Sequence, residues 1–164
     1  MKHKRILAMI LAVASCLSLA VGASAANTTT RKATDFRDYD RTAWYAEAVS
    51  AAVDNGLLYG KSSSIIDPNG DMTRAEMAAI INRSFGCYAK ADISKYKDVS
   101  KDKWYFEDVA MAVQMGTYNG RSNTAMAPDA PITRQEAMTV VARALELDYD
   151  SYSKTDLSTF SDRS

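Results

Sequence analysis

The sequence predicts a mainly α-helical fold built from two tandem helix–loop–helix repeats. The chain matches itself at an offset of 60 residues without a gap, apolar residues recur at helical spacing in each copy, and glycine or capping residues bound those segments. Residues 36–85 and 96–145 share 15 identities in 50 positions, which excludes chance as the origin of the match. We assign repeat 1 to residues 36–86 and repeat 2 to residues 96–147.

The first helix of each repeat is expected between a Trp-Tyr pair and a glycine. It covers residues 44–55 in repeat 1 and runs from 104 to about 115 in repeat 2. Gly56 and Gly116 follow these segments and can adopt the left-handed conformation that ends a helix. In the first copy, one face of the helix carries Val49, Ala52 and Val53.

The second helix of each repeat is expected to begin with a capping box, in which a threonine and a glutamate three residues later satisfy each other's backbone amides. Thr73 pairs with Glu76 in repeat 1, and Thr133 pairs with Glu136 in repeat 2. A Pro turn precedes each box. The face expected to be buried consists of Met77, Ile80, Ile81 and Phe85 in the first copy and Met138, Val140, Val141 and Leu145 in the second.

The segment before the repeats has the pattern of a secretory signal peptide. A basic start, an apolar run over residues 6–21 and an Ala-x-Ala ending predict a signal at residues 1–26, followed by a polar linker at 27–35. An uncleaved membrane anchor and lipidation at Cys16 are the alternatives, the latter because Val13-Ala-Ser-Cys16 is similar to a lipobox. After cleavage we expect no membrane span.

Cleavage changes the charge balance of the chain. The full sequence has 20 Lys and Arg, 20 Asp and Glu and one His; removing residues 1–26 leaves 17 basic side chains, a net charge of −3, no His and Cys87 as the only thiol. This composition argues against a nucleic-acid binder, a histidine-based catalytic site and an internal disulfide. Residues 67–78 begin like a calcium loop but have Met72 where Gly is required and Ala78 where a bidentate Glu is required. We therefore predict no enzyme activity, metal or cofactor.

Two arginines are the strongest candidates for binding. Arg74 and Arg134 occupy the first position of their helices, where the helix dipole disfavours a cation and the free backbone amides attract anions. A carboxylate or phosphate ligand would suit such a site. The alternative, which spacing does not exclude, is an ion pair with a carboxylate of the neighbouring repeat, for example Asp38 or Asp98.

The tryptophans and the loop cations have two interpretations each. Trp44 and Trp104 are favoured as core or inter-helix anchors, with an aromatic platform for a sugar ring as the alternative. Lys61 and Arg121 follow Gly60 and Gly120. These loop residues are either solvated or part of a groove in which glycine permits close approach and the cation attracts an anion.

The combination of Phe/Tyr-x-Asp, Trp-Tyr, a Gly-x-x-x-Gly segment, a Pro turn and Thr-Arg-x-Glu resembles the S-layer homology family over residues 36–145. The resemblance implies three motifs around a pseudo-threefold axis that attach a protein to the bacterial cell wall or S-layer. The implied ligand is secondary cell-wall polysaccharide, often pyruvylated. On this basis Arg74 and Arg134 would hold the anionic group, and the tryptophans and glycines named above would shape the grooves.

Only two full motifs are present, so the threefold arrangement is expected to be incomplete. Residues 160–164 contain Phe-Ser-Asp, which is similar to the start of a third motif, and self-association is another way to complete the arrangement. The sequence thus predicts a secreted, non-catalytic wall-anchoring module. The alternative is the N-terminal anchor of a longer wall-associated glycosidase or hydrolase.

Overall fold

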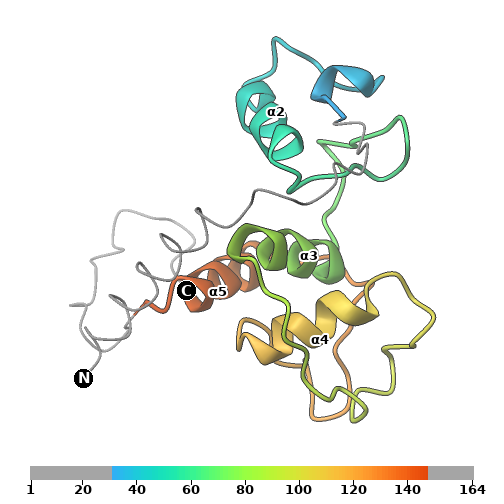
Figure 1. Cartoon of the computed structure of the whole chain (residues 1–164), viewed down its shortest axis with the longest axis vertical. Helices are drawn as coiled ribbons and strands as arrows, with labels where there is room; N and C mark the ends of the chain where they lie inside the picture. The colour runs from blue at the N-terminus through green and yellow to red at the C-terminus, as the bar shows by residue number, and fades with distance from the viewer. Residues whose placement is uncertain (1–30, 148–164) are drawn as a thin grey trace, which may run out of the picture. The chain divides into compact units, whose positions relative to one another are not determined.

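Four α-helices and one short 3₁₀ helix make up the regular structure of residues 31–147, the part of the chain that the computed structural model describes. In chain order they are η1 (Ala33–Asp35), α2 (Ala46–Asp54), α3 (Arg74–Phe85), α4 (Phe106–Gln114) and α5 (Arg134–Ala144) (Figure 1). No β-strand occurs in these residues; Thr73 and Pro131 form one isolated bridge. The prediction of a mainly α fold is confirmed.

The first helices of the repeats begin two residues later than the pattern predicts. Tyr45 and Tyr105 are the N-cap residues of α2 and α4 and have no side-chain cap, so the preceding tryptophans lie outside the helices. Both helices are followed by a glycine with positive φ, +68° at Gly56 and +77° at Gly116. The predicted glycine stops are therefore present in both repeats.

The second helices begin with capping boxes in both repeats. The Thr73 hydroxyl accepts from the Glu76 N–H at 3.2 Å, and the Glu76 carboxylate accepts from the Thr73 N–H at 2.7 Å. The same two bonds measure 3.2 and 2.9 Å between Thr133 and Glu136. Each box satisfies two orphan amides at a helix start, which fixes where α3 and α5 begin.

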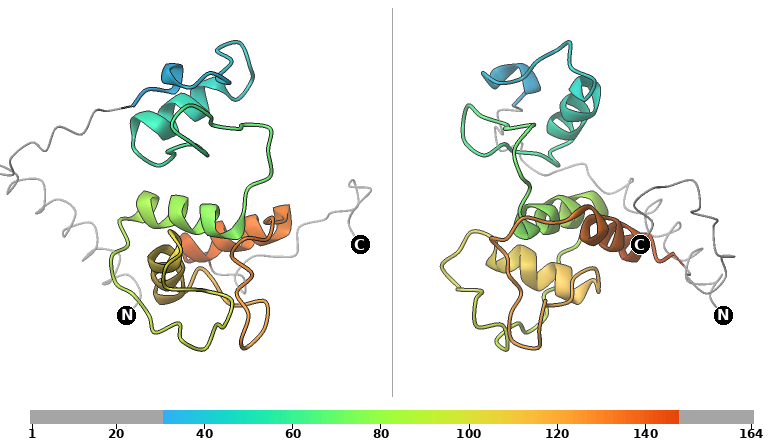
Figure 2. Two further views of the ribbon diagram at one scale, coloured as in Figure 1. Left: turned by 90° about the vertical axis from the view of Figure 1, so that its right-hand side faces the viewer. Right: turned by 180° about the vertical axis from the view of Figure 1, so that it is seen from behind.

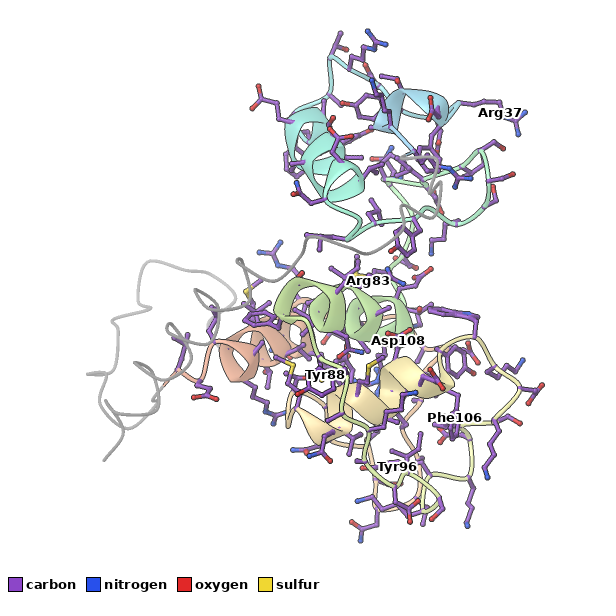
Figure 3. The ribbon with its side chains drawn as sticks, in the orientation of Figure 1. Arg37, Arg83, Tyr88, Tyr96, Phe106 and Asp108 are labelled. Atoms are coloured by element: carbon purple, nitrogen blue, oxygen red, sulfur yellow. The ribbon has the colours of Figure 1, made fainter. Side chains whose placement is uncertain are left out.

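The main hydrophobic core joins α3 of repeat 1 to repeat 2. Ala75, Ala78 and Ile81 of α3 are buried in one cluster with Val109 and Ala112 of α4. Figures 1 and 2 show α3 beside α4, with α5 next to α3. The Asn82 amide of α3 also donates to the backbone oxygen of Asp108 at 2.8 Å and to its carboxylate at 3.2 Å. Asp108, labelled in Figure 3, lies near the start of α4, close to α3.

A second, smaller core holds η1 and α2 together. It consists of Ala33, Phe36, Val53 and Ile66, with three half-buried neighbours. The Asp38 carboxylate accepts from the N–H groups of Ile66 and Asp67 at 3.0 and 2.6 Å, which ties the start of repeat 1 to its loop. Residues 33–35, predicted as the end of a linker, belong to this core through Ala33.

The predicted buried faces of the second helices are wrong at three positions. Phe85, Met138 and Leu145 are exposed, Met138 to 65%. Its counterpart in α3 is Ala78, which is fully buried in the cluster shared with α4. Over the described residues no first helix packs against α5 as α4 packs against α3, which explains the exposure of Met138 and Leu145.

None of the helices between residues 31 and 147 has the length and apolar character needed to cross a bilayer. The predicted signal peptide and the proposed start of a third motif at 160–164 lie outside the described residues, and both stay predictions.

Candidate functional site

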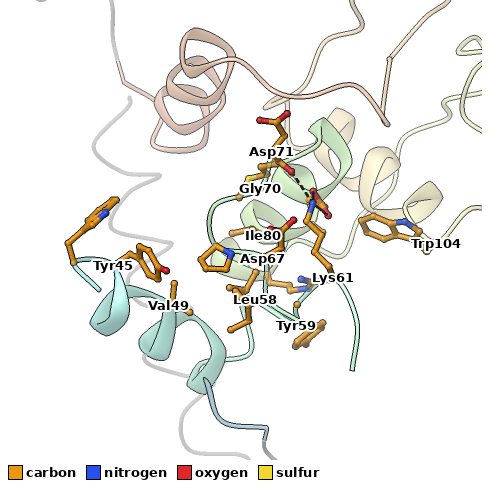
Figure 4. Close-up of a pocket in the computed structure, with 18 residues that line it drawn as sticks. Tyr45, Val49, Leu58, Tyr59, Lys61, Asp67, Gly70, Asp71, Ile80 and Trp104 are labelled. Carbon is orange, nitrogen blue, oxygen red and sulfur yellow. Dashed lines mark hydrogen bonds and ion pairs between the residues drawn. The ribbon is translucent and has the colours of Figure 1, made fainter. Parts of the chain in front are cut away.

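A pocket of about 560 Å³ opens in repeat 1 between α2, the loop that follows it and α3 (Figure 4). Four of the residues predicted to bind ligand line it: Trp44, Gly60, Lys61 and Trp104. Arg74, Gly120, Arg121 and Arg134 are not among its lining residues. This volume falls in the range of small-molecule sites in proteins.

The two tryptophans are surface residues. Trp44 is 95% exposed and Trp104 is 60% exposed. Each stands edge-on to the tyrosine that follows it, with ring centroids 5.7 Å apart at Tyr45 and 5.4 Å apart at Tyr105. In repeat 2 the tyrosine is the buried member, since Tyr105 is only 2% exposed and its hydroxyl donates to Asp129 at 2.8 Å. The interpretation of the tryptophans as core residues is therefore wrong.

The two loop glycines are required by packing inside their own repeats. A Cβ atom on Gly60 would lie 2.5 Å from the Phe36 ring and 2.6 Å from the Ile65 carbonyl oxygen, and its φ is +80°. A Cβ on Gly120 would lie 2.5 Å from the Tyr96 ring. Neither position admits a side chain without movement of the aromatic residue that opens the repeat.

The loop cations are bound to the capping glutamates of their repeats. Lys61 Nζ lies 2.9 Å from Glu76 Oε1 and donates to the Asp71 carbonyl oxygen at 2.9 Å (Figure 4). Arg121 donates to both Glu136 carboxylate oxygens at 3.2 Å. Desolvation raises the pKa of Glu76, but the Thr73 amide and Lys61 outweigh it and hold that pKa below its usual value.

Arg74 is buried and its guanidinium is bound within the protein. The residue is 5% exposed; Nη1 donates to Glu136 Oε1 at 2.9 Å, Nε donates to the Met126 carbonyl oxygen at 3.0 Å, and Nη2 donates to the Asn119 carbonyl oxygen at 3.3 Å. The guanidinium also lies 5.1 Å from the centre of the Tyr118 ring. Arg74 thus has the carboxylate partner of the second interpretation, in the neighbouring repeat, although that partner is Glu136 and not Asp38 or Asp98.

Arg134 has the same place in its repeat but a different environment. It is exposed, and its side chain makes no hydrogen bond or ion pair with residues 31–147. Glu136, two residues away, is shared by Arg74 and Arg121. Desolvation raises the pKa of Glu136, but the Thr133 amide and these two cations keep it below its usual value.

Arg83 lines the pocket and was not among the candidate site residues from the sequence. Arg83 donates to the Leu57 carbonyl oxygen at 3.0 Å and lies 4.2 Å above the centre of the Tyr59 ring. It therefore fixes the loop that carries Gly60. Its recurrence as Arg143, which donates to the Thr117 carbonyl oxygen at 3.4 Å, is the signal that marks its role.

The comparisons with known proteins agree with the resemblance of the motifs. Residues 35–78 and 95–138 match the family model described as the S-layer homology domain. The chain belongs to the S-layer homology domain family. The motif-based prediction of the family is confirmed.

The relatives include surface-layer proteins and an endoglucanase. The chain is 35% identical over 133 residues to the surface-layer 125 kDa protein of Lysinibacillus sphaericus, covering 80% of this chain and 11% of that protein. It is 27% identical over 145 residues to an endoglucanase of Bacillus sp. strain KSM-635, covering 87% of this chain and 15% of the enzyme. An S-layer protein of Bacillus thuringiensis subsp. finitimus is 21% identical over 136 residues, or 83% of this chain and 16% of that protein.

The chain therefore spans only a small part of the relatives it matches. S-layer homology domains are non-catalytic anchoring modules that bind cell-wall polysaccharide, and family membership places this chain at the cell wall or cell surface.

Proposed function

We propose that this S-layer homology domain binds a secondary cell-wall polysaccharide carrying pyruvylated sugars and so holds its protein on the bacterial wall. The observation that carries the proposal is the pair of exposed indoles, Trp44 and Trp104, on the lining of one pocket. Large exposed aromatic groups that pack no core are typical of binding surfaces, and indole faces stack on the apolar faces of sugars.

The anionic group of the polymer is assigned to the cations that water can reach. Lys61 lines the pocket, and Arg121 and Arg134 are exposed on repeat 2. Arg74 supports the site indirectly. It pairs with Glu136, the same carboxylate that binds Arg121, and so helps to hold that carboxylate in place. Pyruvate carboxylates would compete with Glu76 and Glu136 for Lys61 and Arg121.

Binding to purified wall polymer tests this proposal. We expect Trp44→Ala and Trp104→Ala each to weaken binding by about tenfold, since one lost stacking contact is worth roughly 1 to 2 kcal/mol. Tyr88→Ala is the matched control, because Tyr88 is an exposed aromatic residue outside the pocket, with an exposure of 86% that lies between those of the two tryptophans. Removing pyruvate from the polymer should weaken binding of the unmodified chain and leave little further effect of Lys61→Met. Equal binding by the tryptophan variants and the control would reject the pocket as the site.

A second candidate is that this module is the N-terminal anchor of a longer wall-associated glycosidase or hydrolase. The match to an endoglucanase over only 15% of its length favours this candidate. The reading frame downstream in genomic DNA tests it: a continuous frame encoding a glycosidase domain supports it, and a stop codon directly after residue 164 contradicts it.

A further inference from the structure

At the junction between the repeats, the start of α3 in repeat 1 binds repeat 2 through the Arg74 side chain and a short backbone segment. The Arg74 and Ala75 N–H groups donate to the Ala130 and Pro128 carbonyl oxygens at 3.0 and 2.9 Å, and the Ile132 N–H donates back to Met72 at 2.9 Å. Repeat 2 therefore contains a complete acceptor for a helix start that carries arginine.

Repeat 1 has the same acceptor, and no segment of residues 31–147 fills it. The repeat 1 counterparts of the residues that receive α3 in repeat 2 line the pocket described above: Leu58, Tyr59, Ile66, Pro68, Gly70 and Glu76. Glu136 holds both Arg121 and Arg74, whereas Glu76 holds Lys61 and, over the described residues, no arginine. Part of the pocket is thus the space that an Arg74-like side chain fills in repeat 2.

The α2 helix has a matching uncovered face. Val109 and Tyr105 of repeat 2 are buried in the cluster shared with α3. Their counterparts Val49 and Tyr45 are only half-buried and line the pocket. The acceptor therefore combines a helix face with a polar site for arginine.

The α5 helix is the corresponding donor. Arg134 and Met138 are exposed, while their α3 counterparts, Arg74 and Ala78, are buried against repeat 2. Arg134 makes no hydrogen bond or ion pair with the described residues, and Glu76 of the acceptor pairs with Lys61 but with no arginine among those residues. The two ends of the repeat pair are complementary in charge and in apolar surface.

We propose that α5 of one copy of this chain docks into the repeat 1 pocket of a second copy, with Arg134 of the first copy joining Lys61 on Glu76 of the second. The contact repeats between copies what α3 and repeat 2 form within one chain. Because donor and acceptor are different surfaces, the contact is heterologous and can continue through several copies. This association does not require wall polymer, and it uses the pocket and the Arg134 that the proposed function assigns to the polymer, so polymer and a second copy compete for the same site.

Sedimentation of the purified chain without polymer tests the proposal. We expect association that increases with concentration, and Arg134→Glu should weaken it by at least about 30-fold, the effect of removing one member of a desolvated charge pair. Arg41→Glu is the matched control, since Arg41 is exposed, makes no ion pair with the described residues and lies outside the pocket. A monomer at ~1 mM, or equal effects of the two substitutions, would overturn the proposal.

Mixing two variants separates docking from a general loss of folding. Arg134→Glu destroys the donor and keeps the acceptor, and Val49→Glu places a charge on the acceptor face of α2 and keeps the donor. Each variant alone should be monomeric, and an equimolar mixture should form 1:1 dimers that grow no further, because one intact donor then meets one intact acceptor. Circular dichroism confirms that both variants fold. Two folded variants that remain monomeric when mixed would contradict the proposal, as would variants that associate alone.

Discussion

Replacing Arg74 with alanine should destabilise the fold far more than the same substitution at Arg134. The Arg74 side chain is almost fully buried, and alanine would remove its ion pair with Glu136 and its bonds to the carbonyl oxygens of Met126 and Asn119. The alanine side chain has no donor that could replace the guanidinium, so Glu136 Oε1 and the two carbonyl oxygens would each lose a hydrogen bond.

The magnitude follows from what remains after the substitution. Removing one member of a buried ion pair costs about 3 to 5 kcal/mol when the other charge is left alone. Glu136 keeps Arg121 at 3.1 Å, and its side chain is 28% exposed, so the lower end of that range applies. We expect a loss of about 3 kcal/mol, which lowers the melting temperature of a domain of this size by about 12 °C.

Thermal unfolding followed by circular dichroism at low protein concentration measures both variants without a contribution from association. Arg134→Ala should change stability by less than about 0.5 kcal/mol, since Arg134 is exposed and has no polar partner among the described residues. Arg74→Lys should lie between the unmodified chain and Arg74→Ala, because lysine keeps the charge but lacks the planar fork. Equal losses in Arg74→Ala and Arg134→Ala would refute the assignment of Arg74 to the junction.

Three further outcomes follow from the same structure. Gly60→Ala should cost about 2 to 3 kcal/mol in chemical denaturation because its Cβ would meet the Phe36 ring, whereas Gly116→Ala, with nothing within 4 Å, should cost only about 1 kcal/mol for its positive φ. The pKa of Glu136 is lowered in the fold, so the stabilisation by its ionised carboxylate is fully present above pH 4.5 and is lost as pH falls through the folded-state pKa. Glu136→Gln should therefore reduce the change of melting temperature with pH in that acid range. Amide hydrogen exchange should be slower in α4 than in α2, because α4 packs in the main core and α2 only in the smaller one; equal protection would contradict this.

Local sequence signals predicted the helix boundaries well because their causes are local. The capping boxes at Thr73 and Thr133 and the glycine stops at Gly56 and Gly116 need only neighbours within a few residues. The tryptophans show the limit of this approach. In repeat 2 Tyr105 is buried and Trp104 is exposed. Hydrophobicity alone would favour the opposite, burial of the larger and more apolar Trp104 ring.

The environments of equivalent residues could not be predicted from the repeat, because the repeat assigns the same role to both copies. Arg74 and Arg134 occupy the same position of a Thr-Arg-x-Glu motif, yet one is buried and the other exposed. Met138 was expected to be buried because it lies in the apolar stripe of its helix, yet it is exposed, while its counterpart Ala78 is buried. Whether such a residue is buried depends on packing against another repeat, whose residues lie about 60 positions away in the sequence.

The boundaries of the sequence repeat therefore differ from those of the packed unit in the structure, because α3 belongs to repeat 1 in sequence but packs with α4 of repeat 2. Within Thr73-Arg74-Ala75-Glu76, the threonine and glutamate cap the helix of repeat 1, whereas the arginine and alanine pack against repeat 2. One four-residue motif thus both starts a helix and joins two repeats. Residues 31–147 contain two such helix starts but only one such junction, so within these residues repeat 1 keeps an unfilled acceptor and repeat 2 an unpaired donor. A stable assembly of these repeats must satisfy both ends, and for that reason the same arginine can be a structural residue in one copy and an available binding group in the other.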